Sequence, residues 1–199
     1  GDRKIYTMRL VNLPALRRER NSGSSGNCPR QFAVTTMAAR EDFIAWYNGL
    51  LRGRADLRSD DIGAVCTGSS VDDVIQSVYE YVSRDIDLRP NVLYYPEKAA
   101  TTLYNRSGTP EDKTVLAKSI LEARGIRSYI AFARRNDMPD PGAFTAPSTF
   151  TNILLYVPIS TERGAWLDFS NRFRPYGIVD DAIRDVDALV IIRDGYEVK

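Results

Sequence analysis

The chain contains no histidine in any of its 199 positions. Histidine is the usual general base of nucleophilic enzymes and a common metal ligand, so its absence excludes a thiol–imidazole mechanism. Cysteine is scarce: Cys28 and Cys66 have no metal-binding spacing and no neighbouring cluster, which argues against zinc. The two thiols either pair in an oxidising compartment or remain free. We therefore expect no metal and no other cofactor.

Long apolar runs and an excess of one charge are also lacking. No stretch approaches the ~18 apolar residues that a membrane span needs, so we expect no transmembrane segment. The 27 basic and 26 acidic residues nearly cancel, which argues against a nucleic-acid partner. With 43% hydrophobic residues, the chain is long enough to form one domain around a core of its own.

The first 38 residues differ in character from the rest. Residues 5–12 and 32–37 are predicted to be strands, and the Ser- and Gly-rich residues 21–27 between them predict a flexible loop. We interpret residues 1–38 as an N-terminal arm and residues 39–199 as the main domain. The chain starts with Gly rather than Met, so we expect it to be a piece of a longer protein.

Three helices are predicted from apolar spacing and capping residues. The first begins near residue 39 and ends at Gly53. The second opens at Ser70, with Asp73 completing a variant capping box. Its expected apolar stripe consists of Val71, Val74, Ile75, Val78, Val82 and Ile86. The third covers residues 109–124 and is followed by Gly125 in the position of a left-handed cap.

Strands dominate the sequence after the third helix. The predicted strands are 126–133, 150–157, 165–169 and 188–193, with no helix between them. Helices followed by strands predict an α+β domain with an antiparallel sheet. The third helix should contribute Val115, Leu116, Ile120 and Leu121 to the core.

Three short motifs stand in a particular order along the chain. They are Gly-Thr-Pro-Glu-Asp-Lys at 108–113, Phe-Thr-Asn at 150–152 and Trp-Leu-Asp-Phe-Ser at 166–170. Together they resemble the signatures of bacterial transglutaminase-like domains, which read Gly-Asp-Cys-Lys-Asp-Lys, Phe-Asn-His and Trp-Leu-Asp-Pro-Thr. The resemblance covers residues 40–199 and implies a papain-type core, as found in cysteine proteases. It also implies that residues 1–38 are the end of a preceding β-sandwich domain.

The resemblance places the family's nucleophile, base and orienting acid at Pro110, Asn152 and Asp168. Proline has no nucleophilic group, but it suits the first position of a helix that Thr109 caps. Asparagine cannot accept a proton near neutral pH, although Asn152 could still hydrogen-bond to Asp168. Asp168 is open to two interpretations: it holds the fold together by hydrogen bonds, or it binds a ligand at the floor of the cleft.

The resemblance therefore implies a pseudoenzyme in the periplasm or cell envelope of a bacterium. We expect a binding or scaffolding module that holds a peptide, glycan or protein in the vestigial cleft. The expected cleft lining is Tyr94, Tyr95, Asn152 and Asp168. One alternative is an active hydrolase or acyltransferase with another nucleophile, such as Ser107 or Thr109. The other is a purely structural domain that orients its neighbours.

Overall fold

The structure is a computed structural model, and it describes residues 7, 9, 11–12, 34–58, 62, 65, 67–90, 95–138, 146–193 and 195–199. Cys28, Cys66 and Tyr94 lie outside these residues, as does the predicted loop at 21–27. The described parts of the two predicted N-terminal strands are not strands, which corrects that expectation. Most of their side chains are exposed, with Val11 at 61% and Val34 at 74%, although Met37 packs against the core; a strand without a partner is not stable.

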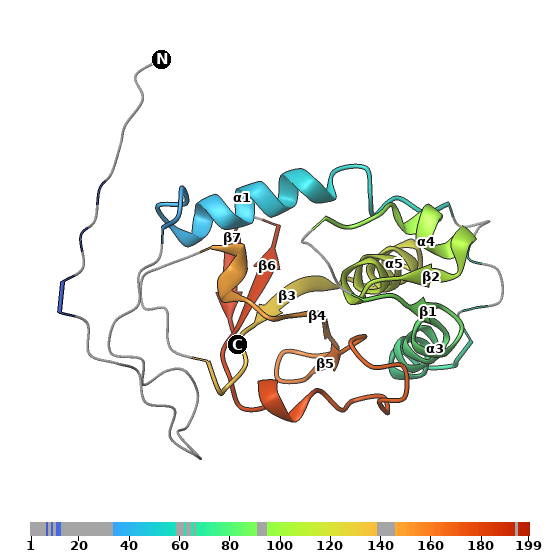
Figure 1. The fold of residues 1–199 in the computed structure, drawn as a ribbon. Helices are drawn as coiled ribbons and strands as arrows, with labels where there is room; N and C mark the ends of the chain where they lie inside the picture. Colours follow the sequence, from blue (N-terminus) through green and yellow to red (C-terminus); the bar gives the residue numbers. More distant parts are fainter. Residues whose placement is uncertain are drawn as a thin grey trace.

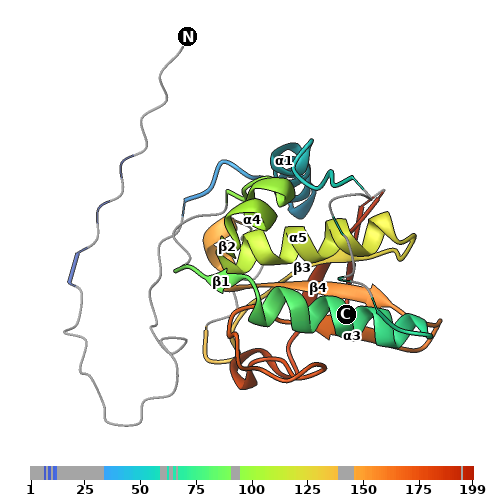
Figure 2. The same ribbon diagram turned by 90° about the vertical axis from the view of Figure 1, so that its right-hand side faces the viewer.

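The helices form one layer of the domain. They are α1 (Arg40–Leu51), α3 (Val71–Arg84), α4 (Ala99–Asn105) and α5 (Pro110–Ala123). Helices α3 and α5 lie side by side over one face of the sheet, and α1 and α4 lie beside them (Figures 1 and 2). No helix in the described residues combines the length and apolarity required to cross a membrane.

The described residues form an antiparallel five-stranded sheet in the order β5-β4-β3-β6-β7. The strands are β3 (Tyr129–Ala133), β4 (Asn152–Pro158), β5 (Gly164–Leu167), β6 (Ala188–Ile192) and β7 (Gly195–Val198). A separate parallel pair joins β1 (Asp87–Leu88) to β2 (Ser107–Gly108). The predicted α+β class with an antiparallel sheet is confirmed.

The helix boundaries follow the capping chemistry predicted from the sequence. Ser70 accepts a hydrogen bond from the amide of Asp73, which forms the predicted capping box. Gly53 and Gly125 have φ angles of +66° and +74°, the left-handed conformation expected after a helix. The amide of Ile126 donates to the carbonyl of Leu121, so this residue closes α5 and strand β3 starts only at Tyr129.

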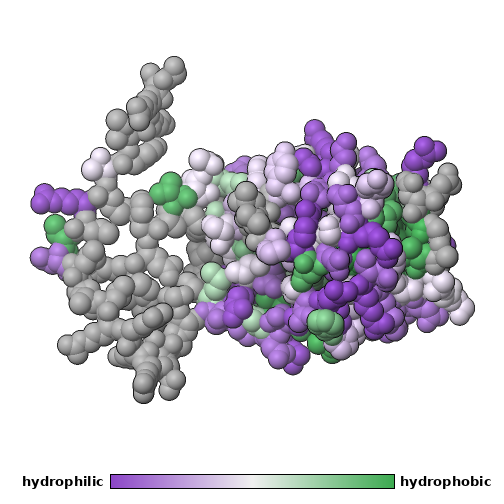
Figure 3. Space-filling model, turned by 45° about the vertical axis from the view of Figure 1, so that its right-hand side comes forward, coloured by the Kyte–Doolittle hydropathy of each residue, from purple (hydrophilic) through white to green (hydrophobic). Residues whose placement is uncertain are grey.

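The main core lies between the helix layer and the sheet. All four predicted core residues of α5 are buried, which confirms them. Val71 is an exception in the predicted stripe of α3: it is 50% exposed because the first turn of the helix projects beyond the core. A smaller cluster that includes Leu154, Ile183 and Val190 covers the opposite face of the sheet. Hydrophilic side chains predominate on the surface shown in Figure 3.

Candidate functional site

The fold brings Pro110, Asn152 and Asp168, the three positions singled out by the sequence motifs, to one end of the domain. Pro110 begins α5, Asn152 begins β4, and Asp168 directly follows β5. Antiparallel pairing of Leu155 with Leu167 places the start of β4 beside the end of β5. Side-chain contacts link the same end to α5: the Phe132 ring lies 5.5 Å from that of Phe150 and 4.7 Å from that of Tyr47, whose hydroxyl donates to Glu111 of α5. We call this region the triad end.

Pro110 occupies the first turn of a fully capped helix. The Thr109 hydroxyl accepts from the Asp112 amide at 3.2 Å, and the Asp112 carboxylate accepts from the Thr109 amide at 2.8 Å. This is the reciprocal capping box that the sequence predicted. Proline loses no helical hydrogen bond at this position, because the first amides of a helix have no partner within it. Pro110 therefore serves as a helix start.

Glu111 is a residue that the sequence analysis did not single out. Its side chain is 1% exposed. The Tyr47 hydroxyl donates to one carboxylate oxygen at 2.7 Å, and the Tyr95 amide donates to the other at 3.1 Å. Burial raises the pKa of Glu111 to about 7, although both hydrogen bonds act in the opposite direction. No sequence signal marks this burial, since a glutamate in the first turn of a helix is normally solvated.

Asp112 completes a second buried carboxylate site. Its side chain is 2% exposed and lies 3.2 Å from the guanidinium of Arg89. It also accepts from the Glu97 amide at 2.7 Å, in addition to the bond within the capping box. Asp112 thus fixes the segment that precedes α4 against the start of α5.

Lys113 is fully buried, with 0% of its surface exposed. Its ammonium donates to the carbonyls of Ser83 and Ile86, at 3.2 and 2.9 Å. These carbonyls lie at the C-terminal end of α3, where a positive charge is favourable. Burial lowers the pKa of Lys113 to about 8, and the nearby charge of Arg172 acts in the same direction. Lys113 therefore joins α5 to α3.

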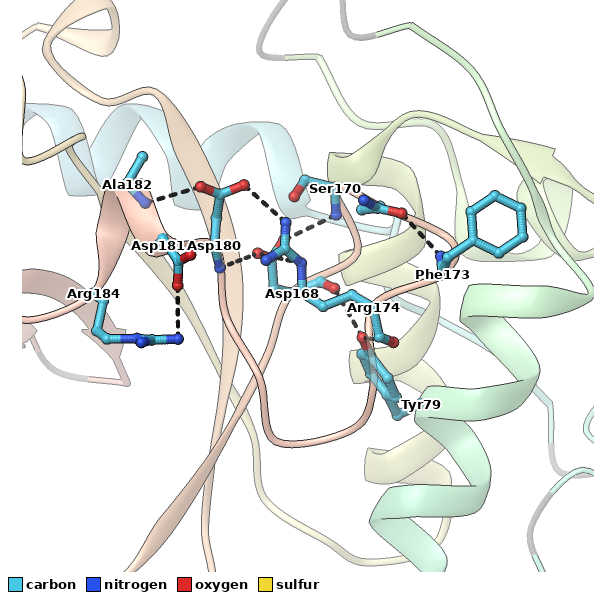
Figure 4. Close-up of polar contacts among 10 residues, drawn as sticks. Tyr79, Asp168, Ser170, Phe173, Arg174, Asp180, Asp181, Ala182 and Arg184 are labelled. Atoms are coloured by element: carbon cyan, nitrogen blue, oxygen red, sulfur yellow. Dashed lines mark hydrogen bonds and ion pairs between the residues drawn. The ribbon is translucent and has the colours of Figure 1, made fainter.

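Asp168 lies at the centre of a closed polar network (Figure 4). It is 0% exposed. One carboxylate oxygen accepts from the Ser170 amide at 2.9 Å. The other accepts from the Asp180 amide at 3.1 Å and lies 3.3 Å from Nε of Arg174. The Tyr79 hydroxyl, from α3, donates to the carbonyls of Asp168 and Arg174. The side chain therefore fastens the loop after β5 to the rest of the domain.

Asn152 lies near Asp168 in the topology but is not among its partners. No hydrogen bond between the two side chains occurs in the described contacts. Asn152 pairs with Ala133, which belongs to the smaller cluster on the face away from the helices. Because side chains alternate along β4, Asn152 projects to that face, whereas Ile153 projects toward the helix layer. Asn152 is therefore separated by the sheet from the helix layer to which Pro110 belongs.

The expected cleft lining is only partly available to a ligand. Tyr95 is 63% exposed, and the guanidinium of Arg54 lies 4.6 Å from the centre of its ring. Asn152 is half-buried. Asp168 has no exposed surface in this conformation, so a ligand does not reach its carboxylate.

The alternative nucleophiles have no base arranged beside them in the described contacts. The Thr109 hydroxyl is engaged in helix capping, and the Lys113 ammonium donates to carbonyl groups. The Glu111 carboxylate has a pKa suited to proton transfer, but it is buried against Tyr47. The described residues contain no cluster of three metal-binding side chains.

Comparison with known proteins shows a similar fold but does not assign the chain to a family. No family model matches the chain, and no curated protein matches it. The crystal structure of a "putative protease" from Parabacteroides distasonis matches with a TM-score of 0.62 and 12% sequence identity. The match covers 82% of this chain and 31% of that protein, so the chain spans about a third of its length. At this identity the comparison concerns the fold alone.

Proposed function

We propose that the chain is a catalytically inactive, transglutaminase-like domain that serves as a binding or scaffolding module. The main support for the proposal is the structure around Pro110, the position at which the resemblance places the nucleophile. Pro110 is the first residue of a capped helix, and the charged residues that follow it are buried against structural partners. The absence of histidine from the whole sequence supports the same conclusion.

The surface that we propose for binding lies at the triad end, around Tyr95 in the helix layer; Asn152 lies on the other face of the sheet and does not share it. An aromatic ring with a guanidinium stacked on it offers an exposed surface for a peptide or glycan. Asp168 belongs to the structural part of the same region, because its carboxylate is fully buried.

A purely structural domain is the second candidate, and one observation favours it. The network of Asp168, Arg174 and Asp180 fastens the loop after β5 and buries the Asp168 carboxylate completely. Replacement of Tyr95 by alanine separates the two candidates. Binding of peptide, glycan or a neighbouring domain falls if the cleft is a binding site, and remains unchanged if the domain only orients its neighbours.

Chemical labelling tests the absence of catalysis. The native and the urea-unfolded chain are each treated with fluorophosphonate and vinyl sulfone probes, and adducts are located by mass spectrometry. We expect no residue to be modified more rapidly in the native state than in the unfolded state. Stoichiometric labelling of one Ser, Thr, Lys or Cys in the native chain alone would revive the active hydrolase or acyltransferase.

A further inference from the structure

The sheet divides at the end opposite the triad end. Strands β3 and β6 pair from Ala133–Ala188 as far as Ala131–Val190, where their register ends. Strand β3 nevertheless continues to Tyr129 beside β4, and β6 continues to Ile192 beside β7. The two strands therefore diverge, and a pocket of about 870 Å³ lies at the divergence. We call it the fork pocket.

The walls of the fork pocket are apolar and aromatic over much of their extent. They include Leu51, Ile130, Tyr129, Tyr156, Pro158 and Ile191. Helices α1 and α5 supply the remaining wall on one side. The volume lies within the range of small-molecule sites, which combine apolar walls with a few polar groups.

The charged groups of the fork pocket are not balanced. Lys118 pairs with Glu122, and Lys199 pairs with Glu197. The other two cations that line the pocket, Arg127 and Arg193, have no acidic partner in the part of the chain that the structure describes. A guanidinium forms strong, often bidentate hydrogen bonds with carboxylates, so the pocket offers two unpaired groups to an anion.

A buried hydroxyl provides an independent indication of a missing partner. Ser128 lines the pocket and is 1% exposed, yet its Oγ has no hydrogen-bond partner among the described residues. Its carbonyl is satisfied, because it accepts from the Lys118 ammonium at 2.9 Å. An unpaired buried polar group is costly and uncommon, and a ligand atom is one way to satisfy it.

We propose that the fork pocket binds a small organic anion, a carboxylate carried on an apolar or aromatic body. The carboxylate pairs with Arg127 and Arg193, and the body lies between Ile130 and Ile191. An oxygen of the ligand accepts from the Ser128 hydroxyl once the ligand displaces the side chains that cover it. This site is separate from the vestigial cleft, so it stands or falls independently of the proposed function.

The probes are N-acetyl-L-phenylalanine, its neutral carboxamide and inorganic phosphate, each titrated into the ¹⁵N-labelled full chain. We expect the amides of Ile130, Ile191 and Ile192 to shift with the carboxylate and to reach half-saturation at or below about 1 mM. The carboxamide, which has the same body and no charge, binds at least about tenfold more weakly. Phosphate, which is charged but has no apolar or aromatic group, also binds at least about tenfold more weakly than the carboxylate.

Two variants identify the groups responsible. Arg127→Gln combined with Arg193→Gln weakens carboxylate binding at least about tenfold, and both side chains are exposed, so folding is preserved. Arg84→Gln, on the exposed end of α3, removes the same type of charge and leaves binding unchanged. Ser128→Ala, which loses no existing hydrogen bond, weakens binding severalfold.

Four results would overturn the proposal. They are equal affinity for carboxylate and carboxamide, equal affinity for phosphate, unchanged binding by the double variant, and the absence of saturable shifts around the fork.

Discussion

The charged and polar groups near the two ends of helix α5 differ in their partners. At the triad end, Glu111, Asp112 and Lys113 are at most 2% exposed, and each has two or more partners from other segments. At the fork pocket, Arg127 and Arg193 have no acidic partner and the Ser128 hydroxyl has no acceptor among the described residues. The first end is therefore held by buried polar contacts, whereas the second end leaves polar and charged groups without a partner among the described residues.

The largest expected effect concerns the two lysines of α5. Lys113→Ala removes a fully buried side chain and leaves the carbonyls of Ser83 and Ile86 without a donor. We expect the free energy of unfolding to fall by about 3–5 kcal/mol in urea titrations. Lys118→Ala, at the fork, removes one hydrogen bond to a carbonyl and an ion pair with a half-exposed glutamate, so it should cost less, about 1–2 kcal/mol. Equal losses for the two variants would contradict the contrast between the two ends.

A conservative variant separates packing from charge at the same position. Lys113→Met keeps most of the side-chain volume and loses both hydrogen bonds. Its free energy of unfolding should therefore lie between that of the wild type and that of Lys113→Ala.

The next effect is a pH dependence caused by Glu111. Its pKa is about 7 in the folded chain against 4.5 for the free group, so the folded state binds the proton more tightly. The contribution of Glu111 to stability is then fully present below pH 4.5 and is lost as the pH rises through 7, by about 3 kcal/mol. The chain has no histidine, the side chain that ordinarily titrates within this window.

Glu111→Gln should remove most of this fall, measured as the free energy of unfolding at pH 5 and pH 7.5. Glu122→Gln, near the other end of α5 with a half-exposed side chain, is the matched control and should preserve it. A fall of the same size in Glu111→Gln would show that another group is responsible.

Capping provides a smaller effect. Thr109→Ala removes the acceptor for the Asp112 amide and should lower the free energy of unfolding by about 1 kcal/mol. Ser70→Ala removes the equivalent acceptor from α3 and should cost a similar amount. A neutral Thr109→Ala variant would mean that the start of α5 does not depend on its cap.

The smallest expected effect has the opposite sign. Ser128→Ala removes a buried hydroxyl without a described partner, so it should leave the chain as stable as before or raise the melting temperature slightly. A loss above about 1 kcal/mol would indicate that the hydroxyl is bonded in the folded protein.

Local sequence signals predicted most of the fold. Ser70 and Thr109 marked helix starts, Gly53 and Gly125 marked helix ends, and runs of β-branched residues marked four strands of the sheet. The short strands β1, β2 and β7 were not predicted, because segments of two to four residues carry almost no periodicity.

The polar interior could not be predicted from the sequence. Glu111 and Tyr47 are 64 positions apart, and nothing local indicates that their side chains meet. A Glu-Asp-Lys run is ordinarily a solvated surface, so the burial of all three residues contradicts the usual expectation. The fork pocket depends on where the register of β3 and β6 ends, which is a property of the pair and not of either strand.

The most direct test of a structural triad end is the stability of Asp168→Ala, compared with Asp181→Ala in the same loop. The first substitution leaves Arg174 and two amides without their buried acceptor, whereas Asp181 is 86% exposed at its ion pair with Arg184. We predict a loss of about 3–5 kcal/mol for Asp168→Ala and less than about 0.5 kcal/mol for Asp181→Ala. A nearly neutral Asp168→Ala variant would contradict the account, since it would mean that the retained acid is not needed to hold the fold.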